Sequence, residues 1–508
     1  MTIARTSCVA LQGLDGALVD VEADIASGLP SFTIIGLPDA ALAEARDRVR
    51  AAAANSGCPL TTHKLTINLS PASLPKHGSA FDLAIALASL AAAGAVSAGS
   101  VASAVHLGEL ALDGRLRPMA GVLPAVLGAA RAGAERVMVP AGNADEARLV
   151  PHIEVIPVAS LREAAIRHGG DYLPEDVEAW PAPAIDDSAD ETPDLADVIG
   201  NEEAVQALLV AAAGGHHVFL LGPPGAGKTM LAERLPGLLP DLDRGASLEA
   251  TSIRSLTGLP VGGRLVTRPP FEAPHHTATA AAIVGGGSGR IRPGAAVRAA
   301  HGVLFLDEAP EFPSSVLDVL RQPLESGCIR IHRASGSAVF PGRFQLVLAA
   351  NPCPCGQYGA PDSECACAPF ARRRYLSRIS GPLMDRIDVR LTLRRITAVQ
   401  LRLNDDGHAL PSAAARQRVA QARRAAAERL SGTPWRMNGE VPGSWLRDRR
   451  NGLGRTATSA LDRALEHGAI TMRGYDRALR MAWSVADIAG ATHPSAEHVG
   501  TALLLRKG

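Results

Sequence analysis

The run GPPGAGKT, from Gly222 to Thr229, has the residue types and the spacing of a loop that cradles phosphate groups. Its glycines let backbone N–H groups approach phosphate oxygens, Lys228 adds a positive charge, and the Thr229 hydroxyl can bind Mg²⁺. An apolar stretch, 217–221, precedes the loop, and a helix-compatible run follows it. The sequence therefore predicts a site for ATP and Mg²⁺, built from Gly222, Pro223, Pro224, Gly225, Ala226, Gly227, Lys228 and Thr229.

Two adjacent acids, Asp307 and Glu308, follow a second apolar run, Val303–Leu306. Beside a phosphate loop, Asp307 is expected to hold Mg²⁺, and Glu308 to orient and deprotonate the attacking water. The alternative interpretation is an acid-rich helix start after a strand. A third strand, expected over 344–350, delivers Asn351, whose amide can hold the same water. Three strands that end in these groups predict an open α/β sheet with its ligand at the carboxyl ends.

Four of the seven cysteines lie within fifteen residues, at Cys353, Cys355, Cys365 and Cys367. Four thiolates in so short a loop can close a tetrahedral site, and Zn²⁺ is the metal that such ligands favour. The C-x-C spacing is tighter than the common one, so reduced buried thiols or a redox pair remain alternatives. His275 and His276 are interpreted as pore or packing residues, and no metal is assigned to them.

The length of 508 residues predicts about three domains. With 47% hydrophobic and 20% charged residues, the composition excludes wholesale disorder, a collagen-like repeat and a disulfide scaffold. The first residues show no signal peptide, which indicates a cytoplasmic protein. Residues 83–105 carry no charge, but their Ala, Ser and Gly content favours a buried helix followed by a loop over a membrane span.

Charge is unevenly distributed along a chain whose formal net charge is zero. Residues 175–203 hold eleven acids and no Lys or Arg, which is typical of a solvated linker between domains. Residues 372–480 hold 23 arginines against 10 acids. This basic third has two interpretations: ordinary solvated helix faces, or a surface for a phosphate backbone.

Taken together, GPPGAGKT, VLFLDE, the run Phe271–Gly287 and the run Leu348–Gly356 resemble the magnesium-chelatase branch of AAA+ ATPases, and within it the competence-linked ComM/YifB group. The resemblance covers nearly the whole chain. It implies a ring of identical subunits, expected to be a hexamer, with each ATP site at a subunit interface.

The resemblance also assigns two arginines. The segment Ser380–Asp388 matches the family segment whose arginine reaches into the neighbouring site, which makes Arg386 the candidate finger and Arg378 a second choice. Thr471–Arg473 matches the second sensor, so Arg473 is expected to contact the γ-phosphate from the lid.

Two insertions, Pro270–Ala300 and Cys328–Phe340, separate this branch from a plain AAA+ module. The second predicts a β-hairpin with a Ser-Gly-Ser turn, with Arg330 and His332 on one face. By resemblance both insertions point into the pore of the ring. The hypothesis is that four arginines follow a DNA backbone; they are Arg290, Arg292, Arg330 and Arg333. No base-reading motif is legible, so structure-selective and salt-dependent binding is expected.

The N-terminal third resembles the proteolytic domain of Lon-type proteases in the runs Leu74–Asp82, Gly108–Gly114 and Ala130–Pro140. The matched positions hold Ala80 in place of the nucleophilic serine and Leu123 in place of the lysine. A Ser-Lys dyad needs a hydroxyl and a base, and a shift of one residue to Ser79 would still lack the lysine. The domain is therefore expected to form a second tier of the ring or to bind a partner, and not to act as a peptidase.

The expected fold class is α/β: a phosphate-loop AAA+ core with a helical C-terminal lid, preceded by an α+β Lon-protease-like domain. The expected boundaries are 1–172 for that first domain, 173–195 for the linker, 196–395 for the core and 396–508 for the lid. The resemblance implies an ATP-driven DNA motor, a helicase-like translocase that promotes branch migration during recombination or natural transformation. A chelatase-like motor and a protein remodeller remain alternatives, although a remodeller usually presents an aromatic pore loop.

Overall fold

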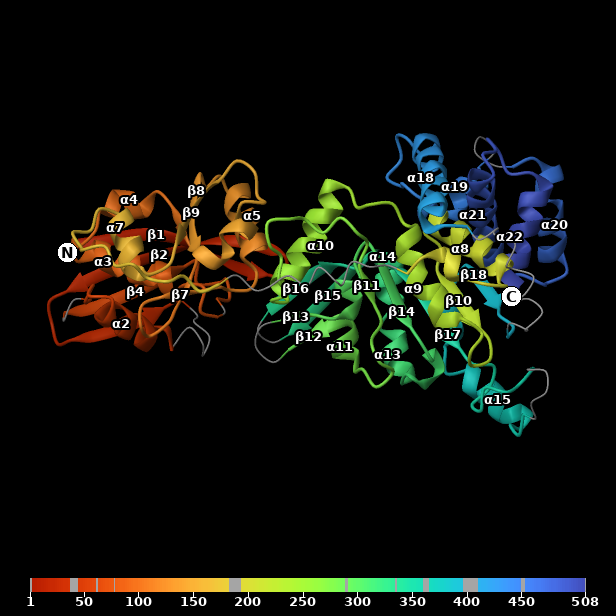
Figure 1. The fold of residues 1–508 in the computed structure, drawn as a ribbon, viewed down its shortest axis with the longest axis horizontal. Helices are drawn as coiled ribbons and strands as arrows, with labels where there is room; N and C mark the ends of the chain where they lie inside the picture. Colours follow the sequence, from red (N-terminus) through yellow and green to blue (C-terminus); the bar gives the residue numbers. More distant parts are fainter. Residues whose placement is uncertain are drawn as a thin grey trace.

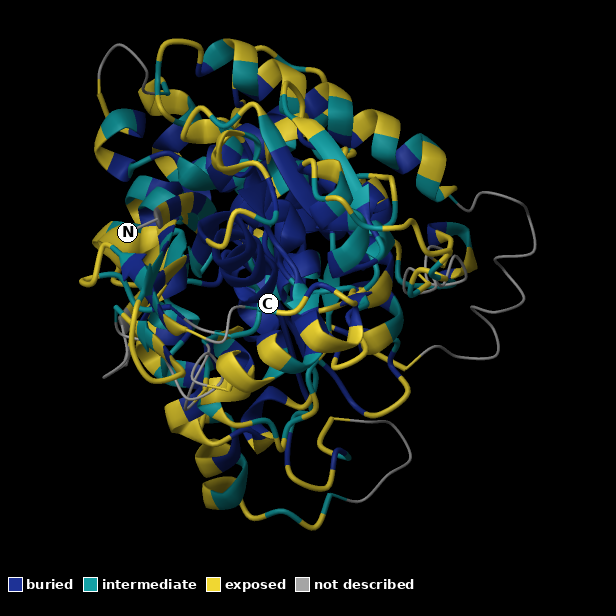
Figure 2. Ribbon diagram, turned by 90° about the vertical axis from the view of Figure 1, so that its left-hand side faces the viewer, coloured by how far each residue is buried: buried dark blue, intermediate teal, exposed yellow. Residues whose placement is uncertain are grey.

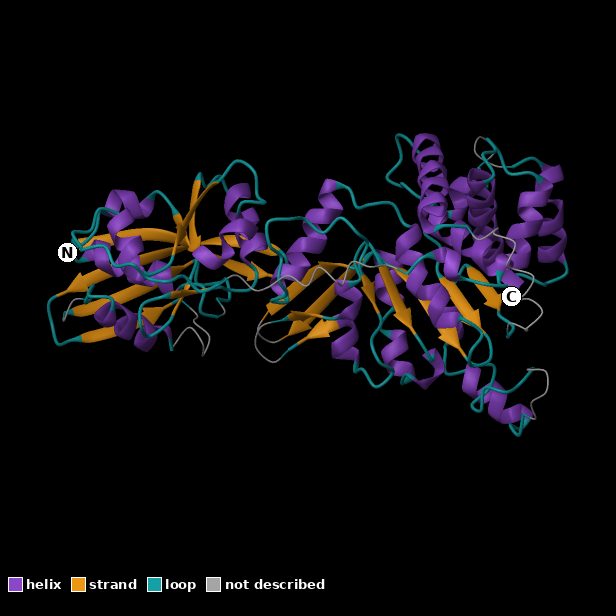
Figure 3. Cartoon of the chain, in the orientation of Figure 1, coloured by secondary structure: helices purple, strands orange, loops and turns teal. Residues whose placement is uncertain are grey.

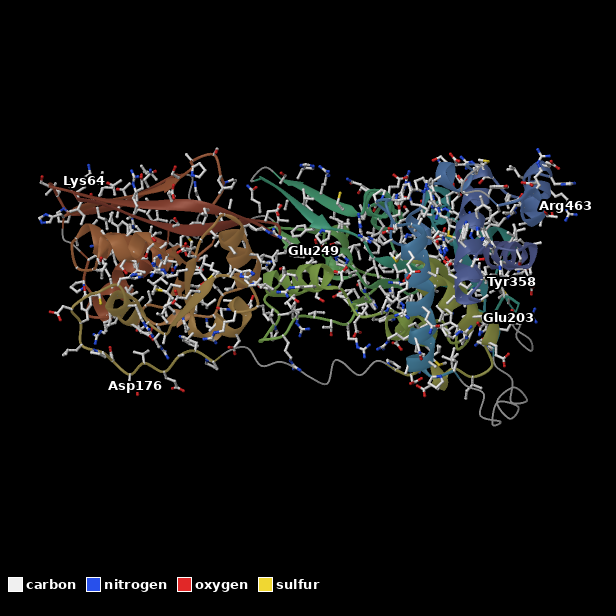
Figure 4. The ribbon with its side chains drawn as sticks, turned by 90° about the horizontal axis from the view of Figure 1, so that it is seen from above. Lys64, Asp176, Glu203, Glu249, Tyr358 and Arg463 are labelled. Atoms are coloured by element: carbon white, nitrogen blue, oxygen red, sulfur yellow. The ribbon has the colours of Figure 1, made fainter. Side chains whose placement is uncertain are left out.

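The computed structural model describes residues 2–36, 44–60, 63–76, 78–181, 193–287, 291–333, 336–359, 365–395, 410–448 and 453–507. It is an elongated molecule of mixed α/β composition, as expected, with one sheet at the N-terminal end, a second in the middle and helices at the C-terminal end (Figures 1 and 3). Figure 4 shows Lys64 near one end, Arg463 near the other and Glu249 between them.

The N-terminal part is built on a mixed seven-stranded sheet. Its centre is a long antiparallel pair, β1 and β2, in which Val19, Val21 and Ala23 are buried while their neighbours Asp20 and Glu22 face outward or lie at the rim. This alternation follows from the two-residue period of a strand. In sheet order the strands are β3 Ser31–Ile35, β4 Lys64–Ser70, β2 Asp15–Ala26, β1 Thr2–Gln12, β5 Val105–His106, β8 Arg136–Pro140 and β9 Glu154–Val158.

The uncharged run 83–105 forms the buried helix that its composition predicts. Every residue of α3, Asp82–Ala92, is buried, and the one acid in it is paired: Arg48 Nε lies 2.9 Å from an Asp82 oxygen. The loop expected after α3 differs in part, because the Ser97 hydroxyl accepts a hydrogen bond from Ser100 N and begins a short helix, α4, Ala98–Ala102. Within the described part of the chain, no helix is both long and apolar enough to cross a membrane.

The middle sheet is entirely parallel and is covered on both faces. Successive residues of its strands alternate between two separate cores: Val218 and Leu220 enter one, and Phe219 enters the other. Buried residues accordingly fill the centre of the molecule in Figure 2. In sheet order the strands are β11 Phe271–Glu272, β14 Val303–Leu306, β17 Gln345–Ala350, β10 Val218–Leu221 and β18 Val389–Thr392.

The C-terminal helices pack on one side of this sheet, against the helix that precedes β10 (Figure 1). Several of their arginines point inward and donate to backbone carbonyls. Arg416 Nε bonds Gly237 O at 2.9 Å, and both Nε and Nη2 of Arg423 bond Ala212 O at 2.9 and 2.7 Å. The basic third is therefore neither a purely solvated face nor a purely nucleic-acid surface. The helices involved are α8 Glu202–Gly214, α18 Ser412–Arg429, α20 Arg455–Glu466, α21 Met472–Ile488 and α22 Ala496–Lys507.

Asp388, just before β18, makes a buried charged contact with these helices. It is 3% exposed, and Arg477 Nη1 on α21 donates to it at 2.6 Å. Burial alone would raise the pKa of Asp388, but the charge of Arg477 and the contact with His216 hold that pKa well below its usual value. The ionised carboxylate therefore stabilises the junction.

Replacing Asp388 with Asn is expected to lower the free energy of unfolding by about 3 kcal/mol at pH 7, because Arg477 is left buried without its counter-charge. Because the pKa of Asp388 is lower in the folded protein than in the unfolded chain, where it is near 3.9, its carboxylate stabilises the fold fully only above that pH. The difference in stability between wild type and Asp388→Asn should therefore shrink as the pH falls below about 4. Urea unfolding followed by tryptophan fluorescence measures both effects. As a control, Asp241→Asn breaks an exposed pair with Arg268 and should change stability by less than about 0.5 kcal/mol. Equal deficits in the two variants would contradict this assignment.

Candidate ATP site

The phosphate loop connects β10 to the helix α9, Lys228–Leu238. Gly225 and Gly227 have φ angles of 77° and 85°, in the left-handed region that residues with a Cβ atom seldom adopt. This backbone presents the start of α9, with its free N–H groups, to any phosphate held in the loop. The sequence motif therefore has the strand, turn and helix that it requires.

The predicted catalytic side chains converge at the carboxyl ends of three neighbouring strands. Lys228 Nζ lies 3.0 Å from Asn351 Oδ1, and the Thr229 hydroxyl lies 2.8 Å from Asp307 Oδ2. Burial lowers the pKa of Lys228, while the carboxylates of Asp307 and Glu308 act in the opposite direction. Strand pairing explains the convergence, because β10 and β14 both lie beside β17.

The donor set fits ATP with Mg²⁺. A hydroxyl and a carboxylate oxygen are the hard ligands that Mg²⁺ prefers, and Thr229 and Asp307 would hold it. The side-chain nitrogen Nδ2 of Asn201 is buried and has no hydrogen-bond partner among the described residues, and it lies 3.8 Å from the point where Gly227 would carry a Cβ atom. A nucleotide bound in the loop could accept a hydrogen bond from this buried donor.

Two contacts at this edge were not predicted from the sequence. His276 Nδ1 lies 3.3 Å from Glu308 Oε2, and Arg395 Nε donates to the backbone oxygen of Pro224 at 3.2 Å. Glu308 itself has a left-handed backbone, with φ at 50°. Both contacts join residues far apart in the chain, so no local motif carries a signal for them.

Arg386 and Arg473 lie at the other edge of the same sheet. Asp388 N and Val389 N both bond His217 O, so the segment carrying Arg386 lies at the amino end of β10, whereas the phosphate loop begins after its carboxyl end. At a rise of about 3.3 Å per residue along the strand, the backbone of His217 lies about 16 Å from that of Gly222. Arg473 is at this edge as well, since Nη1 lies 3.6 Å from Asp385.

The side chain of Arg386 is held in place by several neighbours. It pairs with Glu325 of α14, Arg321–Ser326, and Arg477 donates to its backbone oxygen at 2.9 Å. Burial lowers the pKa of Arg386, and the nearby charges of Arg321, Arg477 and Arg473 lower it further. The second candidate, Arg378, instead bonds Pro310 O at 3.0 Å, close to its own Glu308.

The two insertions form neighbouring β-structures. The second is the expected hairpin, β15 Cys328–Arg333 with β16 Gly336–Pro341, and Arg330 and His332 share its exposed face above the buried Ile329 and Ile331. The turn differs from the expected one, because Gly336 pairs with Arg333 and belongs to the returning strand.

The first insertion is more regular than a flexible loop. It contains α11 Ala280–Val284, the ladder of β12 Gly285–Gly286 with β13 Arg292–Pro293, and α12 Ala295–Arg298. Most of α12 is buried. Arg292 is exposed. Arg290 and the side chain of Arg333 lie outside the described residues.

The four clustered cysteines converge on one point. Sγ of Cys353 lies 3.3 Å from that of Cys355 and 3.7 Å from that of Cys365, and the four sulfur atoms lie within 4.8 Å of one another. Tetrahedral thiolates around Zn²⁺, at Zn–S distances near 2.3 Å, would be about 3.8 Å apart. The geometry is compatible with a structural zinc ion held by Cys353, Cys355, Cys365 and Cys367.

Protein purified without chelators is expected to contain about one zinc ion per chain, measured by elemental mass spectrometry. Cys353→Ser should lose most of it, because one of four ligands is removed. Cys328→Ser, at a free cysteine outside the cluster, is the matched control and should keep its zinc. Wild-type protein with well under one zinc per chain would contradict the assignment and favour reduced thiols.

In the N-terminal domain, the positions compared with a protease dyad are occupied by structural residues. Leu123 is fully buried in α5, Val122–Arg131, and Ala80 has no polar side chain. The hydroxyl of Ser79 donates to Glu109. Lys76 is buried, and its Nζ donates to the backbone oxygens of Gly36 and Leu69 at 2.9 and 3.0 Å.

Comparison with known families agrees with this architecture. The model described as "Magnesium chelatase, subunit ChlI" matches residues 194–401, the model "Subunit ChlI of Mg-chelatase" matches residues 21–143, and the model of the ChlI C-terminal region matches residues 409–506. The chain is thus a magnesium-chelatase-like protein of AAA+ type, a class that implies ATP and Mg²⁺ as ligands and ATPase chemistry.

Comparison with individual proteins places the chain in one family of this class. An uncharacterized protein of Mycobacterium tuberculosis is 50% identical over 509 residues, covering 100% of this chain and 99% of the relative. The competence protein ComM of Haemophilus influenzae is 38% identical, covering 99% and 97%, and the uncharacterized protein YifB of Escherichia coli is 36% identical, covering 100% and 97%. The chain belongs to the ComM/YifB family of magnesium-chelatase-like proteins.

Proposed function

We propose that the protein is a ring-forming, ATP-driven DNA motor, a helicase or translocase that promotes branch migration during recombination or natural transformation. The observation that carries the proposal is the division of the catalytic groups between two edges of one sheet. The phosphate loop, Asp307, Glu308 and Asn351 share one edge, and Arg386 lies at the other. A complete ATP site therefore needs the Arg386 edge of a second copy.

This requirement favours a closed ring, here taken as a homohexamer. A contact between two different edges of identical subunits is head-to-tail, and such contacts close into rings when the rotation permits. Arg473, at the same edge as Arg386, would then contact the γ-phosphate of the neighbouring site rather than its own. Within each site, Lys228 binds phosphate oxygens, Asp307 and Thr229 hold Mg²⁺, and Glu308 with Asn351 positions and deprotonates the attacking water.

The case for DNA as the partner rests on the insertions and on one relative. Arg330 and His332 form an exposed, cation-bearing face on the hairpin, and Arg292 is exposed on the neighbouring ladder. Arginines in such an array can contact successive phosphates, with Arg290 and Arg333 as further members of the set. The relative named for competence is similar over its whole length, which supports a role in handling DNA.

The neighbour's arginine can be tested by complementation. Lys228→Ala lacks a working phosphate loop, and Arg386→Ala lacks the finger, so each alone should lose at least about 10³-fold in the rate of ATP hydrolysis. In an equal mixture, an intact loop from one variant meets an intact Arg386 from the other at about one quarter of the interfaces of a head-to-tail ring. The mixture should therefore recover about one quarter of the wild-type rate of ATP hydrolysis. A mixture as inactive as its components would show that Arg386 acts within its own subunit.

The partner can be tested by steady-state ATP hydrolysis without DNA and with single-stranded, duplex or four-way-junction DNA, at two salt concentrations. Stimulation should be strongest for single-stranded or branched DNA. It should weaken at high salt, because each phosphate contact releases counterions. Arg330→Glu combined with Arg333→Glu should abolish most of the stimulation and keep the DNA-free rate, while Arg463→Glu, an exposed arginine on α20, should change neither.

A rate of ATP hydrolysis that does not change with any form of DNA would instead favour a chelatase-like or protein-remodelling role. Lys228→Ala is the blank in all of these assays.

A further inference from the structure

We propose that His276 is a positioning residue that restrains the catalytic base Glu308 until the inserted hairpins are loaded, so that the hairpin face and the ATP site are coupled. This inference rests on the proposed function only where it names DNA as the ligand that binds the inserted hairpins. The restraint itself depends only on the geometry of the ATP site, and the experiment below separates the two.

The parallel sheet brings His276 to this place. β11 pairs with β14 in parallel, Phe271 opposite Val303, so the chain leaving β11 passes the carboxyl end of β14, where Asp307 and Glu308 follow. There His276 Nδ1 lies 3.3 Å from Glu308 Oε2. A general base must present a free carboxylate oxygen to the water that it deprotonates. A carboxylate oxygen that accepts a hydrogen bond from an imidazole has that lone pair occupied and is not free to take a proton from the water.

The imidazole is held in this orientation by its neighbour. The ring of His275 packs on that of His276, with centroids 4.1 Å apart, and His275 Nδ1 lies 2.9 Å from the Thr277 hydroxyl. On the other side, Glu308 has a left-handed backbone that few residues with a Cβ atom adopt. Strain of this kind at a site often accompanies a second conformation, in this case one in which the carboxylate turns toward the nucleotide.

The loop that carries His276 is physically continuous with both insertions. After His276 the chain passes through α11 and enters β12 at Gly285, nine residues on. The ladder of β12 with β13 carries Arg292. A Cβ atom on Gly285 of β12 would lie 2.8 Å from Ile331 Cδ1, on the buried face of the second hairpin. Since packed elements shift together, a load on Arg330 or Arg292 can displace the His276 loop.

The side-chain chemistry supplies a sharp pair of variants. His276→Ala removes the donor, and His276→Asn replaces Nδ1 with an amide nitrogen at a similar distance from the backbone. Without DNA, the alanine variant should hydrolyse ATP about five-fold faster than wild type, the scale of one partly exposed hydrogen bond to a charged group, and the asparagine variant should stay near the wild-type rate. With saturating single-stranded DNA the three proteins should agree within about two-fold, so the stimulation ratio falls only in the alanine variant.

Two further measurements exclude a merely structural effect. The Kd for a non-hydrolysable ATP analogue should be unchanged in both variants, because His276 contacts Glu308 and the ring of His275, neither of which belongs to the phosphate loop. His301→Asn is the matched control: it removes a second His–Glu pair, with Nε2 2.7 Å from Glu249, at a residue whose φ of 64° asparagine tolerates. It should leave the DNA-free rate and the stimulation ratio as they are.

A DNA-free rate in His276→Ala that is unchanged or lower would overturn the restraint. A wild-type enzyme that hydrolyses ATP without any response to DNA would contradict the proposed function. Even then, the faster DNA-free rate of the alanine variant, with rescue by asparagine, would still establish the restraint.

Discussion

The parallel order of the five-stranded sheet is the constraint on which the chemistry depends. Because the strands run the same way, the segments that follow β10, β14, β17 and β11 all emerge at one edge, and each brings one part of the site: the phosphate loop, the acid pair, Asn351 and the His276 loop. The same order keeps Arg386, which precedes β18, at the far edge. In the proposed ring, a single subunit would therefore supply its phosphate loop to one ATP site and its Arg386 to a second.

At the edge that carries Arg386, several arginines lie close enough for their positive charges to repel one another. Three of them pair with carboxylates: Arg477 with Asp388, Arg386 with Glu325 and Arg473 with Asp385. Arg390 and Arg506 instead donate to the backbone oxygens of Met384 and Ile387. Arg477 also bonds the backbone of Arg386, so a shift of α21 against the sheet would be transmitted to Arg386. The helical layer and the segment that carries Arg386 are therefore directly connected.

The contiguous motifs could be predicted from the sequence, because each is local. The phosphate loop, the acid pair after β14 and the hairpin at 328–341 depend on residues close together in the chain. The structure has the strands that they imply, although the hairpin turn differs from the expected one. The first strand, β1, is not apparent from the sequence, since three consecutive polar residues, Arg5, Thr6 and Ser7, interrupt its apolar residues. The contact of His276 with Glu308 joins positions 32 residues apart, on the segments that follow β11 and β14, and the pairing of these strands brings them together.

The composition of the basic third illustrates why counting charges is a weaker guide than contacts. Its arginine excess suggested either a solvated face or a phosphate surface, but guanidinium groups also serve as rigid donors inside a protein. The oxygen of Ala212 lies in the last turn of α8, where carbonyls have no partner within the helix, and Arg423 supplies two bonds to it. Arg480 bonds Val441 O in the same way, at 2.6 Å. Part of the arginine excess in the sequence therefore serves to fix the C-terminal helices to neighbouring helices and loops.

The cysteine cluster connects to the same chemistry through packing. The loop begins directly after Asn351, and Gly356, with φ at 75°, lies so close to the phosphate loop that a Cβ atom there would come within 2.7 Å of the Pro224 ring. On its outer side the loop meets α15, Pro369–Leu376, where the Arg372 guanidinium lies 3.9 Å above the Tyr358 ring. A metal bound to the four thiolates would fix a segment that has little secondary structure of its own. Its effect on the ATP site would be to hold Asn351 and Pro224 in register, a mechanical role that needs no chemistry from the metal.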